Sequence, residues 1–190
     1  MEYPENRYQN KIITIPNMLS FFRLCLIPVI VWQYTVNNNY TLSLWILALS
    51  GLTDIADGII ARKFGMISNF GKVFDPVADK LTQIAVLFCL VTRFPFMWLP
   101  LVLLIFKELF AGITGLMMVR RGIVIGADWH GKMTTALLYG TMLLHLAWVD
   151  IVPALSNVLI GACAAAIILS GMLYGIRNIS CLLKGGCVRG

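Results

Sequence analysis

The acidic residues that could perform chemistry are concentrated in one stretch, residues 53–80, with the sequence TDIADGIIARKFGMISNFGKVFDPVADK. It holds four of the nine acidic residues of the chain, Asp54, Asp57, Asp75 and Asp79, between two very apolar segments. Residues three or four apart share one face of a helix, so Asp54 and Asp57 form one acidic stripe and Asp75 and Asp79 form a second. A short turn can fold the two helices together, so the four carboxylates are predicted to converge.

Small residues accompany both stripes, with Gly58 and Ala61 on the first and Gly71 on the second. They leave room for a ligand to approach the backbone closely. Carboxylate oxygens select hard divalent cations, with Mg²⁺ or Mn²⁺ as the default. Two such ions about 4 Å apart clamp the attacking and leaving oxygens in phosphoryl transfer. We therefore predict a site for two divalent cations that acts on a phosphate-containing substrate.

Converging carboxylates repel one another unless positive charge lies close to them. The cations that flank the acids in the sequence are predicted to supply it: Arg62, Lys63, Lys72 and Lys80. The same residues support an alternative interpretation, in which an ion-pair network merely closes a helical hairpin.

The elements that must position these acids are predicted to be membrane-spanning helices. The chain has 190 residues, of which 59% are hydrophobic and 13% charged, and its mean hydropathy is +0.83. A crossing needs roughly 20 apolar residues. The fold class predicted is an all-α integral membrane bundle of six transmembrane helices, at about residues 17–36, 41–62, 72–92, 96–120, 131–150 and 153–183.

The distribution of positive charge predicts the orientation of this bundle. Most lysines and arginines fall at the termini or at the even-numbered breaks, whereas the other face carries only Arg93. By the positive-inside rule both termini, and the metal site at the ends of the second and third spans, face the cytoplasm. We predict a multi-pass protein of the bacterial cell (inner) membrane, with an N-terminal segment at 1–16, a six-span domain at 17–184 and a tail at 185–190.

Other interpretations of the composition are weaker. The net charge of +6 is explained by topology and by contact with membrane lipid, so nucleic-acid binding is not expected. A cation transporter is disfavoured because its site should lie near the middle of the membrane. The five cysteines show no metal-binding spacing and are predicted to be reduced packing residues. His145 is predicted to be a packed residue and not a catalytic one.

The spacing of the acidic stretch also carries a family resemblance. Asp54-x2-Asp57-Gly58-x2-Ala61-Arg62-x8-Gly71-x3-Asp75-x3-Asp79 resembles the signature of the CDP-alcohol phosphatidyltransferase family at all eight specified positions. The segment from Ile15 to Arg23 resembles the opening of that family's first helix, although Ser20 stands where threonine is commoner. With six predicted spans, the resemblance covers nearly the whole chain.

This resemblance implies transfer of a phosphatidyl group from CDP-diacylglycerol to an alcohol, with release of CMP. It implies that Asp54, Asp57 and Asp75 ligate the cation pair and that Asp79 is both a ligand and the general base. The residues implied to line the CDP-diacylglycerol pocket are Gly58, Ala61, Arg62, Gly71 and Asn17. The resemblance also implies a homodimer.

The acceptor alcohol is less clearly marked. The segment 71–81 is similar to that of phosphatidylglycerophosphate synthases and of cardiolipin synthases, and Gly131-Lys132-Met133-Thr134-Thr135 resembles the former, which favours glycerol 3-phosphate. Against this, Lys107-Glu108 and Gly115 replace an Arg-Glu pair and a second arginine, so phosphatidylglycerol remains the alternative acceptor. Neighbours on a helix point in different directions, so Lys107 and Glu108 are not required to pair. The predicted acceptor-binding residues are Lys107, Arg120, Arg121 and Lys132.

Overall fold

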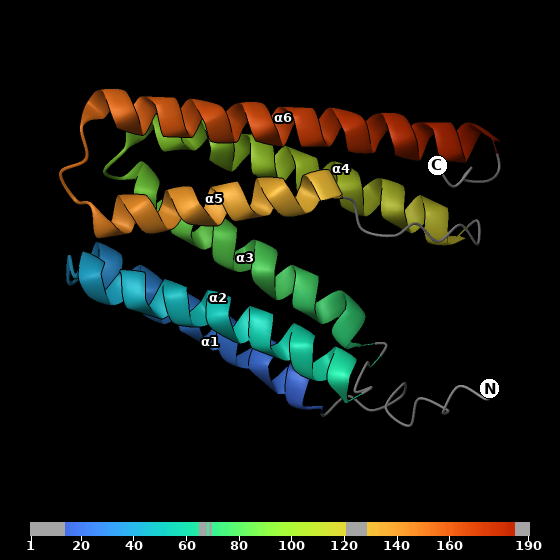
Figure 1. Ribbon diagram of the computed structural model, residues 1–190, viewed down its shortest axis with the longest axis horizontal. Helices are drawn as coiled ribbons and strands as arrows, with labels where there is room; N and C mark the ends of the chain where they lie inside the picture. The colour runs from blue at the N-terminus through green and yellow to red at the C-terminus, as the bar shows by residue number, and fades with distance from the viewer. Residues whose placement is uncertain (1–13, 65–67, 69, 121–128, 185–190) are drawn as a thin grey trace. The chain divides into compact units, whose positions relative to one another are not determined.

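The computed structural model describes residues 14–64, 68, 70–120 and 129–184, and these residues contain helices but no strand (Figure 1). The helices, in chain order, are α1 (Ile15–Thr35), α2 (Tyr40–Lys63), α3 (Gly71–Val91), the short 3₁₀ helix η1 (Pro95–Met97), α4 (Trp98–Arg120), α5 (Trp129–Ala147) and α6 (Pro153–Lys184). The all-α prediction is confirmed. The six α-helices lie within a few residues of the predicted segments.

Four segments of the described chain are long and apolar enough to cross a membrane. They are Ile15–Thr35, Tyr40–Ala61, Pro95–Met118 and Pro153–Cys181. The start of α3 carries Asp75, Asp79 and Lys80, which lower its apolar character. The helices indicate a multi-pass membrane protein, and the number of crossings stays a prediction.

Many large apolar side chains lie on the surface of the helices. Trp45, Phe106 and Ile176 are examples, with 67%, 71% and 66% of their area exposed. So much exposed apolar area would be unfavourable in water, and it suits a protein surrounded by lipid.

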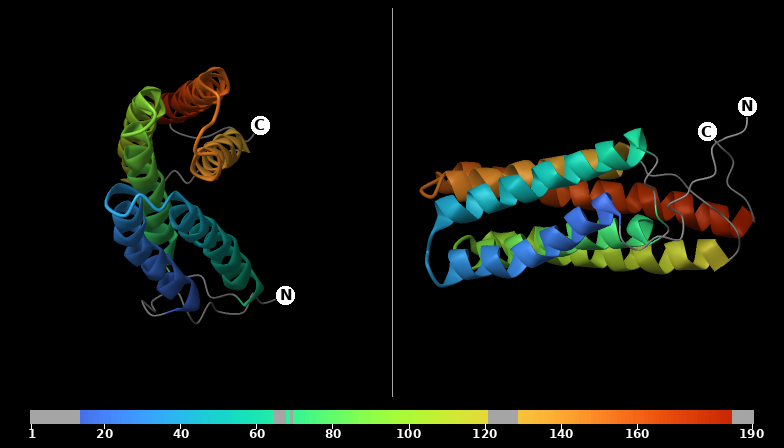
Figure 2. Two further views of the ribbon diagram at one scale, coloured as in Figure 1. Left: turned by 90° about the vertical axis from the view of Figure 1, so that its left-hand side faces the viewer. Right: turned by 90° about the horizontal axis from the view of Figure 1, so that it is seen from below.

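The chain divides into two compact units, described here one at a time. The first contains α1, α2, α3 as far as Cys89, and residues 146–149. The helices α1 and α2 lie side by side as a hairpin (Figures 1 and 2). Asn38 adopts a left-handed backbone conformation (φ 50°) in the connection, and asparagine tolerates this conformation better than most residues. The side chain of Asn39 then caps α2 by accepting a hydrogen bond from the N–H of Leu42 at 3.0 Å.

The second unit contains η1, α4, α6 and α5 up to His145. Asn178 of α6 donates to the hydroxyl of Thr114 of α4 at 3.0 Å, which links these two packed helices. His145 is 2% exposed, and its ring nitrogens lie 2.8 Å from the carbonyl oxygen of Thr141 and 3.0 Å from Oγ of Ser156. His145 is therefore packed and hydrogen-bonded, as the sequence predicts.

The cysteine prediction is correct only in part. Cys25, Cys89 and Cys163 are free thiols, whereas Cys181, in the last turn of α6, is disulfide-bonded. The prediction of reduced cysteines is therefore wrong for Cys181, because sequence spacing does not show which thiols meet in space.

Candidate metal centre

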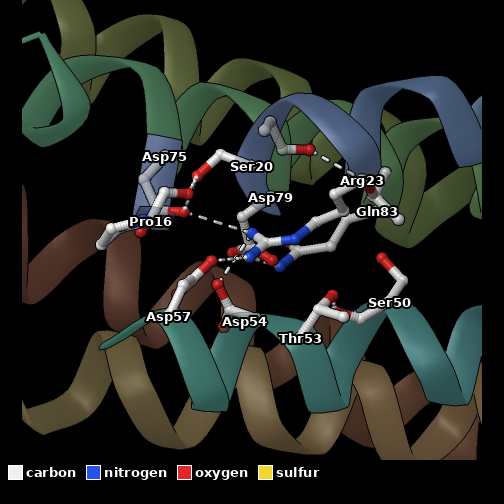
Figure 3. Close-up of polar contacts among 12 residues, drawn as sticks. Pro16, Ser20, Arg23, Ser50, Thr53, Asp54, Asp57, Asp75, Asp79 and Gln83 are labelled. Carbon is white, nitrogen blue, oxygen red and sulfur yellow. Dashed lines mark hydrogen bonds and ion pairs between the residues drawn. The ribbon is translucent and has the colours of Figure 1, made fainter. Parts of the chain in front are cut away.

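Helix α1 brings a buried arginine to the acidic stripes of α2 and α3. The side chain of Arg23 has no exposed area. Its Nη1 lies 2.7 Å from Oδ1 of Asp54, and its Nη2 lies 2.7 Å from Oδ2 of Asp57. Nη1 also lies 3.4 Å from Oδ1 of Asp75. One guanidinium thus contacts carboxylates from two helices, and Figure 3 shows it among them.

Three of the four aspartates form a tight cluster. Asp54, Asp57 and Asp75 each offer an oxygen within 4.8 Å of the other two. Asp57 is 2% exposed, whereas Asp54 and Asp75 are 38% and 41% exposed, so the cluster is open on one side. The predicted convergence of the two stripes is confirmed for these three residues.

Asp79 lies one helical turn beyond Asp75 on α3. Its Oδ2 accepts a hydrogen bond from Nε2 of Gln83 at 3.1 Å. Gln83 has no exposed area and is therefore fixed in the helix packing. Asp79 lies outside the group of three mutually close oxygens, and its roles as ligand and base stay predictions.

One source of positive charge at the cluster was not predicted from the sequence. The cations predicted to balance the acids lie close to them in sequence, yet the guanidinium that contacts the cluster is Arg23, more than 30 residues upstream. Lys63 is exposed, and the side chains of Arg62 and Lys72 lie outside the described residues. A buried side chain on a packed helix can supply charge from a distant part of the chain, and sequence proximity does not reveal this.

Sequence reasoning also gave no role at the cluster to Ser20 of α1. Its hydroxyl lies 2.9 Å from Oδ1 of Asp75 and 3.1 Å from the carbonyl oxygen of Pro16. A signal was present, because Asn17, Ser20 and Arg23 recur every three residues in an otherwise apolar helix, and all three are buried. Buried polar residues in a membrane helix usually face partners inside the bundle.

A second group of contacts joins the starts of α1 and α3. Nδ2 of Asn17 donates to Oγ of Ser68 at 2.9 Å, and Ser68 accepts the backbone N–H of Gly71 at the same distance. A Cβ on Gly71 would collide with Oδ1 of Asn17 and lie 3.0 Å from Oγ of Ser68. The structure therefore brings together two residues of the predicted donor pocket, Asn17 and Gly71, and explains why residue 71 lacks a side chain.

This close approach leads to a prediction for Gly71→Ala. Because the added methyl group must push Asn17 away, we expect the free energy of unfolding to fall by about 1–3 kcal/mol, the usual cost of overpacking. Thermal unfolding of the detergent-solubilised protein measures the change. Gly51→Ala in α2 is the matched control, because nothing lies within 4 Å of its added Cβ. Alanine also favours a helix over glycine, so equal losses in the two variants would contradict the explanation.

The remaining predicted donor-pocket residues lie on α2. Gly58 and Ala61 are half-buried there, and the side chain of Arg62 is outside the described residues. Their contact with the donor stays a prediction.

The predicted acceptor-binding residues that the structure describes lie in the second compact unit. Arg120 and Lys132 are exposed, and Arg121 lies outside the described residues. Lys107 donates to Oε1 of Glu108 at 2.9 Å, although adjacent helix positions were not expected to require such a pair. Both side chains are mostly buried, where an unpaired charge is costly, and their length lets them meet.

The donor set of the cluster fits a divalent cation. Asp54, Asp57 and Asp75 offer only carboxylate oxygens, which are the ligands that hard cations prefer. The open side formed by Asp54 and Asp75 provides access, and the cluster already accommodates one cationic group, the guanidinium of Arg23. The arrangement could therefore bind a divalent metal ion.

Comparison with known proteins identifies the family. The profile of the family described as CDP-alcohol phosphatidyltransferase matches residues 13–172. A CDP-diacylglycerol--glycerol-3-phosphate 3-phosphatidyltransferase of Rickettsia felis is 38% identical over 96 residues, 50% of this chain and 53% of the relative. The enzyme of the same name from Rickettsia typhi is 45% identical over 69 residues, 35% of this chain and 39% of the relative.

A cardiolipin synthase (CMP-forming) of Streptomyces coelicolor is 35% identical over 125 residues, 62% of this chain and 58% of the relative. The matched part of the chain thus spans about half, or less, of the length of the Rickettsia relatives. The family profile, in contrast, covers most of the chain and includes α1, α2 and α3 with the whole aspartate cluster. The chain therefore belongs to the CDP-alcohol phosphatidyltransferase family.

Proposed function

We propose that this protein transfers a phosphatidyl group from CDP-diacylglycerol to an alcohol and releases CMP. The favoured acceptor is glycerol 3-phosphate, which gives phosphatidylglycerophosphate. The observation that carries the proposal is the complete eight-position pattern from Asp54 to Asp79 in a member of this family, with three of its acids clustered at one place.

The proposed cofactors are two divalent cations, Mg²⁺ or Mn²⁺, held by Asp54, Asp57, Asp75 and Asp79. When bound, they would neutralise the negative charge of the pyrophosphate and of the departing CMP. The close oxygens of the first three aspartates support this assignment. Asp79 follows Asp75 by one turn on the same helix, which supports its inclusion.

Asp79 is the proposed general base. Its carboxylate would take the proton of the acceptor hydroxyl as that oxygen forms a bond to the lipid-side phosphorus and the bond from phosphorus to CMP breaks. The hydrogen bond from Gln83 to Oδ2 restricts rotation of this carboxylate. Asn17, Gly58, Ala61, Arg62 and Gly71 are proposed to contact CDP-diacylglycerol.

The proposed setting is the cell (inner) membrane, with six crossings and both termini in the cytoplasm. The asymmetric distribution of lysine and arginine supports this orientation. A site near the membrane surface would let the acyl chains stay in lipid while the nucleotide stays in water. We also propose a homodimer, on the strength of family membership.

Phosphatidylglycerol is the second candidate acceptor, and it would give cardiolipin. Lys107 is already paired with Glu108, and residue 115 is a glycine, so α4 offers less free positive charge to a phosphate-bearing acceptor. The alignment with the cardiolipin synthase of Streptomyces coelicolor is also longer than that with the Rickettsia felis enzyme. In favour of glycerol 3-phosphate, a segment of 69 residues is 45% identical to a Rickettsia typhi enzyme named for that acceptor.

The acceptor is tested with purified protein, CDP-diacylglycerol and a panel of alcohols, with the products identified by mass spectrometry. We expect CMP release and phosphatidylglycerophosphate formation with glycerol 3-phosphate. Turnover with phosphatidylglycerol alone would replace the favoured acceptor with the second candidate. No CMP release with any alcohol would contradict the transferase proposal itself.

A further inference from the structure

Arg23 occupies a position that a metal ion would also favour. Its terminal nitrogens contact oxygens of Asp54, Asp57 and Asp75, the same three side chains whose oxygens lie within 4.8 Å of one another. A divalent cation and a guanidinium so close together repel each other by several times the thermal energy. Binding of the cation and retention of the guanidinium in this place are therefore in competition.

The charge of the cluster allows it to hold either the guanidinium of Arg23 or a divalent cation. Three carboxylates against one guanidinium leave the cluster negative, so it still attracts a divalent cation. Without Arg23, the metal-free protein would hold three close carboxylates, one of them Asp57 with 2% exposure, without this counter-charge. Arg23 thus keeps the carboxylates together until a cation arrives.

Three buried polar atoms of the first unit, one of them on Arg23, make no hydrogen bond within the described residues. Nε of Arg23, Oε1 of Gln83 and Oγ of Ser50 are buried and make no hydrogen bond within the described part of the chain. Gln83 comes from α3 and Ser50 from α2, and Figure 3 draws both side chains in the same close-up as Arg23. The oxygen of Gln83 and the hydroxyl of Ser50 can accept hydrogen bonds, so they are candidate acceptors for a displaced guanidinium.

We propose that Arg23 is an exchangeable internal counter-ion. Its guanidinium neutralises Asp54, Asp57 and Asp75 in the metal-free protein and leaves these carboxylates when a divalent cation binds. Arg23 therefore sets the affinity of the cluster for the cation. This role rests on the proposed function, because it takes the aspartates to be the cation ligands.

The test measures Mn²⁺ binding directly, by electron paramagnetic resonance of free Mn²⁺, with the full chain in detergent micelles. Arg23→Gln removes the charge and leaves a shorter, neutral polar side chain. We expect this variant to bind Mn²⁺ about tenfold more tightly than the unmodified protein, equivalent to about 1.4 kcal/mol. Its melting temperature without metal should be lower, and Mn²⁺ should raise that temperature more than it does in the unmodified protein.

Two further variants complete the design. Arg23→Lys keeps the charge but replaces the planar fork of the guanidinium with a compact ammonium group. The affinity of this variant for Mn²⁺ should therefore lie between those of the other two proteins, at about threefold tighter than that of the unmodified protein. If Arg23→Gln does not fold, Mn²⁺ binding by Arg23→Lys alone tests the proposal. Arg93→Gln is the matched control, because Arg93 belongs to the second compact unit and lies 3.5 Å from the exposed Asp150. The Mn²⁺ affinity of this variant should not change.

The two possible failures are distinguishable. Unchanged or weaker Mn²⁺ binding by the Arg23 variants would overturn the counter-ion role and leave the cation site intact. Absence of Mn²⁺ binding by the unmodified protein would instead overturn the cation site of the proposed function, and the counter-ion role with it.

Discussion

Asp79→Asn is expected to lower turnover at least about 100-fold, the lower end of what general acid–base catalysis contributes. Asparagine has nearly the same shape as aspartate, but its amide cannot accept the proton of the acceptor hydroxyl. Its oxygen can still accept the hydrogen bond that Gln83 donates to Asp79 at 3.1 Å. The helices should therefore form normally. Release of CMP from CDP-diacylglycerol by the purified variant measures the loss.

The same variant separates the two roles proposed for Asp79. If Asp79 is mainly a base, Mn²⁺ affinity should change little while turnover falls. If it is mainly a ligand, both should fall together. Activity within about threefold of the unmodified protein would contradict either role, provided that circular dichroism shows the same helix content.

Asp57→Asn is expected to have a comparably large effect through the cation site. Asp57 is the most buried of the three clustered carboxylates, with 2% exposure, and it lies 2.7 Å from Nη2 of Arg23. Loss of residues that merely support metal ligands costs about 10–100-fold in affinity, so loss of a ligand should cost at least about 100-fold. Mn²⁺ titration and CMP release should both show this decrease.

The fold should survive Asp57→Asn. Removing one partner of a buried ion pair usually costs about 3–5 kcal/mol, because the other charge is left unpaired. Here Arg23 still contacts Asp54 and Asp75, so we expect a smaller loss of stability. Asp150→Asn is the matched control, because Asp150 is 93% exposed and lies on the second compact unit, where no change in Mn²⁺ affinity is expected. A variant that binds Mn²⁺ normally would remove Asp57 from the ligand set.

Much of the fold was predictable from the sequence because membrane helices need long apolar runs. Polar breaks such as Asn37-Asn38-Asn39 and Arg93-Phe94-Pro95 separate those runs, and the helices begin and end close to them. The acidic stripes were predictable for a related reason. Helical periodicity places Asp54 with Asp57 and aligns Asp75 with Asp79, and the fixed spacing of the eight positions pointed to the family.

The partners of the site were harder to predict. Contacts between α1 and the other two helices join residues far apart in the sequence, such as Arg23 and Asp57, 34 positions apart, and Ser20 and Asp75, 55 positions apart. Helical periodicity gives no information on contacts between residues so far apart in the sequence. The sequence therefore favoured the neighbouring arginine and lysines as counter-charges. The close approach of Asn17 to Gly71 was hidden in the same way.

The sequence by itself determined an all-helical membrane protein with two acidic helix faces, because hydropathy and helical periodicity depend only on the order of residues. Only the tertiary structure decided that Arg23 balances Asp54, Asp57 and Asp75. The physical reason is that a buried charge takes the partner that helix packing brings within a few ångströms, wherever that partner lies in the chain.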